Sequence, residues 1–288
     1  MTPTQTLLLS RRSESQTTSG VTGEGTQISR TDPHQFELPE RFIRAARIHD
    51  PMPAPETPLF RWTHQAQEEL ETLLHSHVAE RSFPCVGAKA ALARGTLDVL
   101  ACSRLDSAWD DLRIHDGLVR FAAAYRAEPT LFRSYAVVFE GPDGLDEPTF
   151  EAALWKRIQS ISDKDVWRGQ SYDGRVSHDP DSPHFSLSFG GEAFFVVGLH
   201  PNASRPARRF ARPTLVFNLH DQFEQLRADG RYETMREAIM VRDEKVAGSR
   251  NPMLARHGEL SEARQYSGRV VDAAWRCPFH YAGGSEPA

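Results

Sequence analysis

Residues 185–199 have the sequence FSLSFGGEAFFVVGL, which is the clearest local signal in the chain. Apolar residues alternate with serines in its first five positions, as in a strand with one apolar face. The pair Gly190-Gly191 predicts a two-residue turn, because glycine reaches the left-handed backbone conformations that such turns require. Residues 193–199 are apolar and predict a returning strand. We therefore expect a β-hairpin over these residues.

Apolar residues recur at helical spacing on both sides of this hairpin. The predicted helices lie around residues 70–78, 118–125, 150–158, 223–226 and 235–239. Two further buried strands are predicted at residues 134–139 and 214–219. From Gly248 onward the chain is polar and rich in glycine and proline, which predicts an irregular C-terminal wrap. This order of elements predicts an α+β fold, a single domain with a mainly antiparallel sheet flanked by helices.

The N-terminal part of the chain differs in composition from the rest. Residues 1–38 are rich in Ser, Thr, Gln and Gly without an apolar pattern, which predicts a disordered tail. Residues 39–62 contain Pro51, Pro53, Pro55 and Pro58 and predict an extended connector. The α+β domain is then expected over residues 63–288.

Composition excludes several classes of protein. The 288 residues carry a net charge of -5, so no basic excess favours a nucleic-acid partner. The longest apolar runs are far shorter than the ~20 residues of a membrane-spanning helix, and we expect no membrane partner. Three scattered cysteines predict neither a disulfide framework nor structural zinc. With no apolar signal core near the N-terminus, the expected location is cytoplasmic.

Cys85 is the first candidate for chemistry. It follows a proline and opens an alanine-rich segment in the run Phe83-Pro84-Cys85-Val86-Gly87-Ala88. Free N–H groups at a helix N-terminus lower the pKa of a thiol and favour the thiolate, which suits a nucleophile or a metal ligand. The alternative is a small buried side chain that packs against a turn.

A histidine and four arginines follow the second strand of the predicted hairpin. His200 ends this strand, and the next loop contains Arg205, Arg208, Arg209 and Arg212. Neutral imidazole is a common metal ligand, and clustered guanidinium groups match carboxylates or phosphates. The loop therefore predicts an anion site beside an apolar strand, with a solvated basic surface as the alternative.

Two further positions offer ligand atoms. His220 ends the strand over 214–219 and predicts either a ligand or a cap for the helix that follows. Cys277 precedes a proline, a context in which a thiolate can bind heme iron. The common nucleotide-binding and hydrolase motifs are absent from the sequence. From the residues alone, we expect an α+β domain with an arginine-lined pocket.

Several motifs in this order resemble the YqcI/YcgG family, from about residue 83 to residue 279. The motifs are Phe83-Pro84-Cys85, Gly198-Leu199-His200-Pro201 with Ser204-Arg205, Phe217-Asn218-Leu219-His220 with Gln222-Phe223, Asn251-Pro252-Met253, Gln265-Tyr266-Ser267-Gly268-Arg269 and Trp275-Arg276-Cys277-Pro278-Phe279. Characterised members are heme-dependent N-hydroxylases that act on guanidino groups of arginine-like amino acids. The resemblance therefore implies heme b, dioxygen, an arginine-like small-molecule substrate and a ferredoxin- or flavoprotein-type reductase.

The resemblance also implies roles for particular residues. The axial ligand of the iron is expected to be Cys85 or His200, with His220 and Cys277 as further alternatives. The heme propionates are expected to pair with the arginines of one loop, namely Arg205, Arg208 and Arg209. A cationic guanidinium group is expected to meet a carboxylate, for which Glu262 and Asp179 are the candidates.

Two other functions stay open at this point. The first is a heme- or anion-binding module without oxygenase activity, which would use the same arginines. The second is a structural or interaction protein without a cofactor, in which the C-terminal motifs only stabilise the fold.

Overall fold

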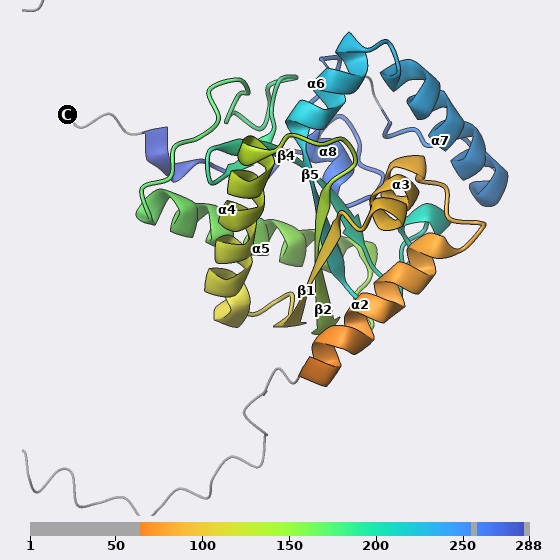
Figure 1. The fold of residues 1–288 in the computed structure, drawn as a ribbon, viewed down its shortest axis with the longest axis horizontal. Helices are drawn as coiled ribbons and strands as arrows, with labels where there is room; N and C mark the ends of the chain where they lie inside the picture. Colours follow the sequence, from red (N-terminus) through yellow and green to blue (C-terminus); the bar gives the residue numbers. More distant parts are fainter. Residues whose placement is uncertain (1–63, 255–257, 285–288) are drawn as a thin grey trace, which may run out of the picture. The chain divides into compact units, whose positions relative to one another are not determined.

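The computed structural model describes residues 64–254 and 258–284. Within them, helices cover both faces of a five-stranded sheet with the strand order β1-β2-β5-β4-β3 (Figure 1). Three of the four strand pairings are antiparallel. The predicted α+β class with a mainly antiparallel sheet is thus confirmed. The predicted tail over 1–38 and the connector over 39–62 lie outside the described residues.

The predicted hairpin is confirmed as strands β3 (Leu187–Phe189) and β4 (Glu192–Leu199). Gly190 and Gly191 form its turn, with φ angles of 59° and 80° that glycine adopts without steric cost. Its serines do not face solvent, because Ser186 and Ser188 are both buried. Strand β3 is therefore covered on both faces.

Strand β1 (Leu97–Arg104) is an element that the sequence analysis missed. It lies parallel to β2 (Ser134–Gly141), with Leu97 opposite Ser134. A short 3₁₀ turn, η1 (Ala108–Asp110), and the helix α4 (Asp111–Ala127) make the crossover between them. The remaining strand, β5 (Thr214–Leu219), pairs with β2 and β4 and begins and ends where the sequence predicted.

The outer edge of β1 is occupied by a side chain. Gln67 of helix α2 (His64–Ala79) donates from Nε2 to the Val99 carbonyl at 2.9 Å. Its Oε1 accepts from the Ala101 N–H at 2.8 Å. The primary amide thus takes the place of a neighbouring strand at one point, which leaves fewer open backbone groups for pairing with another chain.

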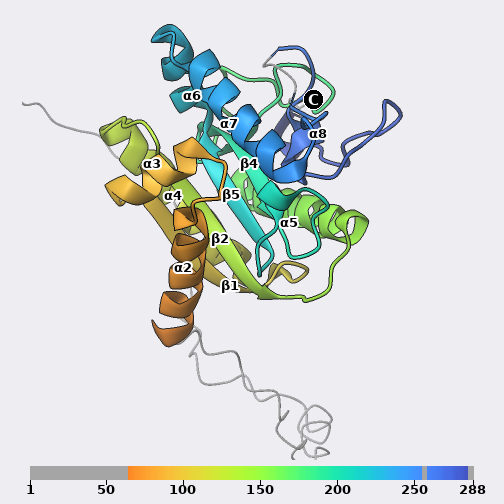
Figure 2. The same cartoon turned by 90° about the vertical axis from the view of Figure 1, so that its right-hand side faces the viewer.

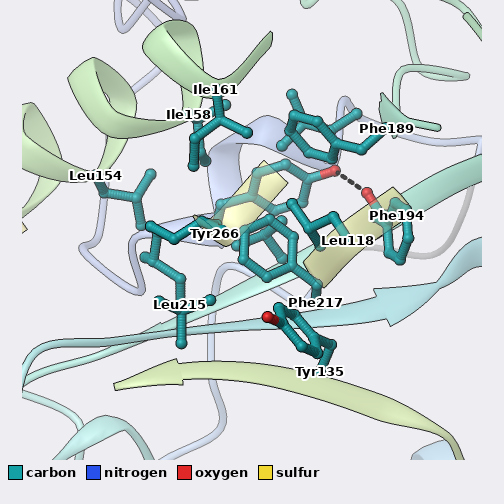
Figure 3. Packing of buried hydrophobic residues seen from close by; sticks show 14 of the residues in the cluster. Leu118, Tyr135, Leu154, Ile158, Ile161, Phe189, Phe194, Leu215, Phe217 and Tyr266 are labelled. Carbon is teal, nitrogen blue, oxygen red and sulfur yellow. Dashed lines mark hydrogen bonds between the residues drawn. The ribbon is translucent and has the colours of Figure 1, made fainter. Parts of the chain in front are cut away.

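The helices form one layer on each side of the sheet (Figure 2). Helices α4 and α5 (Glu147–Trp167) cover one face, and α2 and α3 (Val86–Arg94) cover the other. Since successive strand residues point to opposite faces, Phe194 and Val196 join the α4/α5 core, whereas Phe195 and Val197 face the opposite side. Figure 3 shows the α4/α5 core, in which the Tyr266 hydroxyl donates to the Phe194 carbonyl at 3.3 Å.

Two helices follow β5 directly, α6 (His220–Ala228) and α7 (Tyr232–Ala247). The chain after α7 contains the short helix α8 (Ala263–Tyr266) and the 3₁₀ turn η3 (Ala282–Gly284), and it is otherwise irregular where described. The predicted C-terminal wrap is therefore confirmed within the described residues.

Candidate functional site

An apolar cavity of about 220 Å³ lies over the sheet face that carries Phe195 and Val197. Helices α3, α6 and α7 and the segment around α8 form its other walls. Most of its lining is apolar, from Phe132, Phe223, Met235, Ile239 and Met240 among others. A concave apolar site with a few polar groups is the usual form of a small-molecule binding site.

Cys85 lies on the cavity wall at the start of α3. It is the N-cap residue of this helix, which confirms the predicted position, and its Sγ accepts from the Ala88 N–H at 3.4 Å. The expectation of a lowered thiol pKa is wrong, however. Burial raises the pKa of Cys85 and outweighs the opposing effects of the helix N–H groups and of the positive charge on Arg208. Cys85 is therefore a neutral thiol unless a bound cation removes its proton.

Glu262 is a buried carboxylate on the same cavity. Its Oε2 accepts from the Ser186 hydroxyl at 2.8 Å, which fixes the side chain against β3. Its Oε1 lies 4.0 Å from His220 Nε2. A buried carboxylate that is oriented in this way suits a cationic ligand, because low polarity around it strengthens charge pairing.

His220 lies beside this carboxylate but lines a second hollow, together with Arg175, His184 and Glu224. It is the first residue of α6, while Leu219 is the N-cap residue and makes no side-chain cap. The capping alternative for His220 is therefore wrong.

The arginines of the β4–β5 loop bind within the protein and do not line the cavity. Arg208 donates to the carbonyls of Gly198 (3.1 Å), Tyr266 (3.2 Å) and Gln265 (3.0 Å). Burial lowers the pKa of Arg208 to about 10, so it remains a cation at neutral pH. This contact holds Gln265, a cavity residue, against the end of β4.

Two other arginines of this loop are also engaged. Arg209 donates to the carbonyls of Ala203 and Ser204 at 2.7 and 2.9 Å. Arg205 pairs with Asp243 of α7, with a distance of 2.8 Å between Nε and Oδ2. The structure therefore does not bring Arg205, Arg208 or Arg209 to the cavity as binding groups.

His200 lies on the opposite face of the sheet. Its ring stacks on Phe150 of α5, with 4.3 Å between ring centroids and an angle of 18° between planes. Burial lowers the pKa of His200, which favours neutral imidazole despite the nearby Glu147. Its Nδ1 is buried without a hydrogen-bond partner among the described residues. His200 and Cys85 are thus not brought together.

The two remaining candidate residues, Cys277 and Asp179, lie away from the cavity. Cys277 packs against the α4/α5 core, and burial raises its pKa to about 12. Asp179 is in an irregular segment, where its Oδ1 accepts from the Asp181 N–H at 3.0 Å in a local turn. Neither residue lines the cavity.

The cavity has its own arginines, which the sequence analysis did not select. They are Arg133, Arg227 and Arg236. The Arg133 side chain has a buried Nε without a hydrogen-bond partner in the described part of the chain. Gln222 holds the Arg133 backbone by accepting from its N–H at 2.7 Å and donating to its carbonyl at 2.8 Å. None of these three arginines lies in a motif of the sequence analysis. The nearest signal was the pair Gln222-Phe223, which belongs to the motif that contains His220 and which lines the cavity.

The described residues contain neither a cluster of metal ligands nor a membrane-spanning helix. Within residues 64–254 and 258–284, no three His, Cys, Asp or Glu side chains gather as a group suited to a metal ion. Among the same residues, no helix has both the length and the apolar composition needed to cross a lipid bilayer.

Comparison with known protein families identifies the family of this domain. Residues 74–280 match the model of the YqcI/YcgG family. No curated protein and no solved structure matches the chain. The matched segment includes the sheet and all the residues that line the cavity.

Proposed function

This chain belongs to the YqcI/YcgG family, and we propose that it is a heme-dependent oxygenase that N-hydroxylates the guanidino group of an arginine-like small molecule. The observation that carries the proposal is an apolar cavity with a thiol, Cys85, and a buried carboxylate, Glu262, on its walls. The family resemblance supplies the reaction class, and the cavity supplies residues with the chemistry that this reaction needs.

The residues of the cavity fit heme b. A heme site needs a donor for the iron, apolar walls for the porphyrin and cations for the propionates. The Cys85 thiol is the donor, and the aromatic and aliphatic side chains of the sheet, α6 and α7 are the walls. Arg133 is the proposed cation, because its buried Nε has no hydrogen-bond partner among the described residues and its Nη2 has only a long contact of 3.9 Å with Asp98 Oδ2. These assignments replace the loop arginines, whose donors are used within the protein.

Bound heme would supply the activation of dioxygen, with electrons from a ferredoxin- or flavoprotein-type reductase. One oxygen atom is added to the substrate nitrogen, and the other leaves as water with two electrons and two protons. In this proposal the Glu262 carboxylate pairs with the substrate guanidinium and sets its orientation. Arg208 stabilises the Cys85 thiolate by its positive charge, and the apolar walls exclude water.

We also propose a cytoplasmic location for this reaction. The structure leaves Cys85, Cys102 and Cys277 as free thiols, which is usual in a reducing compartment.

An absorption spectrum of the purified protein tests the cofactor. The full chain, expressed with heme supplementation, is expected to show a Soret band. The substitution Cys85→Ser should shift or abolish that band, while Cys277→Ser, outside the cavity, should leave it unchanged. A folded protein without a Soret band that also fails to bind hemin in a titration would contradict the proposal.

Turnover tests the reaction separately from the cofactor. The holoprotein is incubated with L-arginine, a reductase system and air, and the products are analysed by mass spectrometry. A mass gain of one oxygen that is lost in Glu262→Gln supports the oxygenase. Heme binding without turnover of any guanidino compound would favour the heme-binding module instead.

A further inference from the structure

Helix α7 covers the cavity with a partly buried face and has few fully buried residues of its own. Asp243 is the only buried residue among the sixteen of α7. Its apolar residues Met235, Ile239 and Met240 point to the cavity rather than into a packed core. Figure 1 shows α7 at the margin of the fold, beside α6 and α3. An element with a single fully buried residue opens more easily than the core does.

The one buried residue of α7 makes an ion pair with the body of the protein. Asp243 Oδ2 accepts from Nε of Arg205 at 2.8 Å and also from its Nη2. The side chains are only 5% and 11% exposed, so water screens the pair weakly. Arg205 also donates to the Ser249 carbonyl at 2.7 Å, just after the end of α7. Arg205 therefore contacts both the C-terminal half of α7 and the residue that follows Gly248.

Both ends of α7 adjoin a glycine in the left-handed region. Gly230 precedes the helix with a φ of 69°, and Gly248 follows it with a φ of 75°. A Cβ at either position would meet no atom within 4 Å, so these glycines serve the backbone conformation and not close packing. Short segments of this kind can absorb the backbone rotation of a moving helix.

We propose that α7 is a lid of the cavity and that the Arg205–Asp243 ion pair is its latch. While the pair is intact, α7 lies over the cavity opposite Cys85, the N-cap residue of α3, and narrows access to it. When the pair breaks, α7 swings or frays about its flanking glycines, and the cavity opens to solvent and to ligands of the size of a small molecule. This lid does not depend on which ligand the cavity binds, so it stands apart from the proposed oxygenase reaction.

Thiol labelling under native conditions tests the lid without any ligand. Cys85 lines the cavity on which α7 lies and is partly exposed, whereas Cys102 is 0% exposed in the α4/α5 core and reports global unfolding. The full chain is treated with N-ethylmaleimide, and the labelling of each cysteine is followed by peptide mass spectrometry. In Asp243→Asn, Cys85 should react about tenfold faster or more, with Cys102 unchanged.

A matched control lies on the same helix. Glu244 pairs with Arg250 at an exposed position, and Glu244→Gln should leave both labelling rates at the wild-type values. Arg205→Gln breaks the latch from the other side and should reproduce the effect of Asp243→Asn. In the wild-type protein, low urea should not change Cys85 labelling, whereas Cys102 labelling should follow global unfolding.

Two results would overturn the proposal. In the first, Cys85 reacts at the same rate in both latch variants as in the wild type. In the second, Cys85 and Cys102 accelerate together, which would mean that the pair stabilises the whole domain. If neither variant folds, the labelling of the wild-type protein in urea decides. Equal urea dependence of the Cys85 and Cys102 labelling rates would exclude a lid that opens independently of global unfolding.

Discussion

Gly198 near the end of β4 is the position where the smallest change should have the clearest effect. A Cβ at this residue would lie 2.8 Å from Phe150 Cε1, 2.9 Å from Leu154 Cδ1 and 2.9 Å from the Tyr266 carbonyl oxygen. Contacts this short force a shift of α5 or of the backbone of α8, and overpacking of this kind costs about 1–3 kcal/mol. Replacing glycine also restricts the unfolded chain, which offsets about 0.4–1 kcal/mol.

The net expectation for Gly198→Ala is therefore a loss of about 1–2 kcal/mol in the free energy of unfolding. In a domain of this size, that corresponds to a fall in Tm of about 2–8 °C. Thermal unfolding by circular dichroism measures it, with Gly174→Ala as the control, because a Cβ at Gly174 meets nothing within 4 Å. If the two variants have the same Tm, the close packing of β4 against α5 and Tyr266 is refuted.

Three further substitutions test other contacts. Gln67→Leu leaves two backbone groups of the β1 edge without their partner and should lower the free energy of unfolding in urea by about 1–3 kcal/mol. The exposed edge should also increase light scattering by aggregates. Gln65→Leu, at an exposed position, should change neither quantity. Arg208→Met removes the side-chain donor from three carbonyl groups, of which that of Gln265 keeps a backbone donor, and should cost about 3–5 kcal/mol in the same assay. Burial lowers the pKa of His200, so the unfolded chain binds more protons and stability falls as the pH drops below about 6.5. In His200→Gln, this fall between about pH 7 and pH 5 should be smaller, and an equal fall would contradict the assignment.

The elements that the sequence predicted correctly are those with a local pattern. The hairpin of β3 and β4 depends on Gly190-Gly191 and on apolar residues within fifteen positions, and β5 is a short apolar run. Strand β1, residues 97–104, has no such local pattern. It is stabilised by pairing with β2, which follows only after a helical crossover. Leu97 pairs with Ser134, and this long-range pairing has no signature in either segment alone.

The candidate site divides in the same way. The position of Cys85 at a helix N-terminus was readable from Pro84 and the alanine-rich segment after it. Its pKa was not, because burial by distant segments outweighs the local N–H groups. The four arginines after His200 suggested ligand binding, yet Arg208 binds backbone carbonyls of residues 58 and 57 positions away.

Local periodicity, turn residues and family motifs thus determined the fold class, the hairpin and the candidacy of Cys85 and Glu262. Only the tertiary structure decided that these two residues share a cavity, that Arg133 joins them, and that Arg205 fastens α7 instead of binding a ligand. The physical reason is the distance along the chain over which each interaction acts. Backbone preferences act over a few residues, whereas a charged side chain pairs with whatever the fold places within a few ångströms of it, at any separation along the chain.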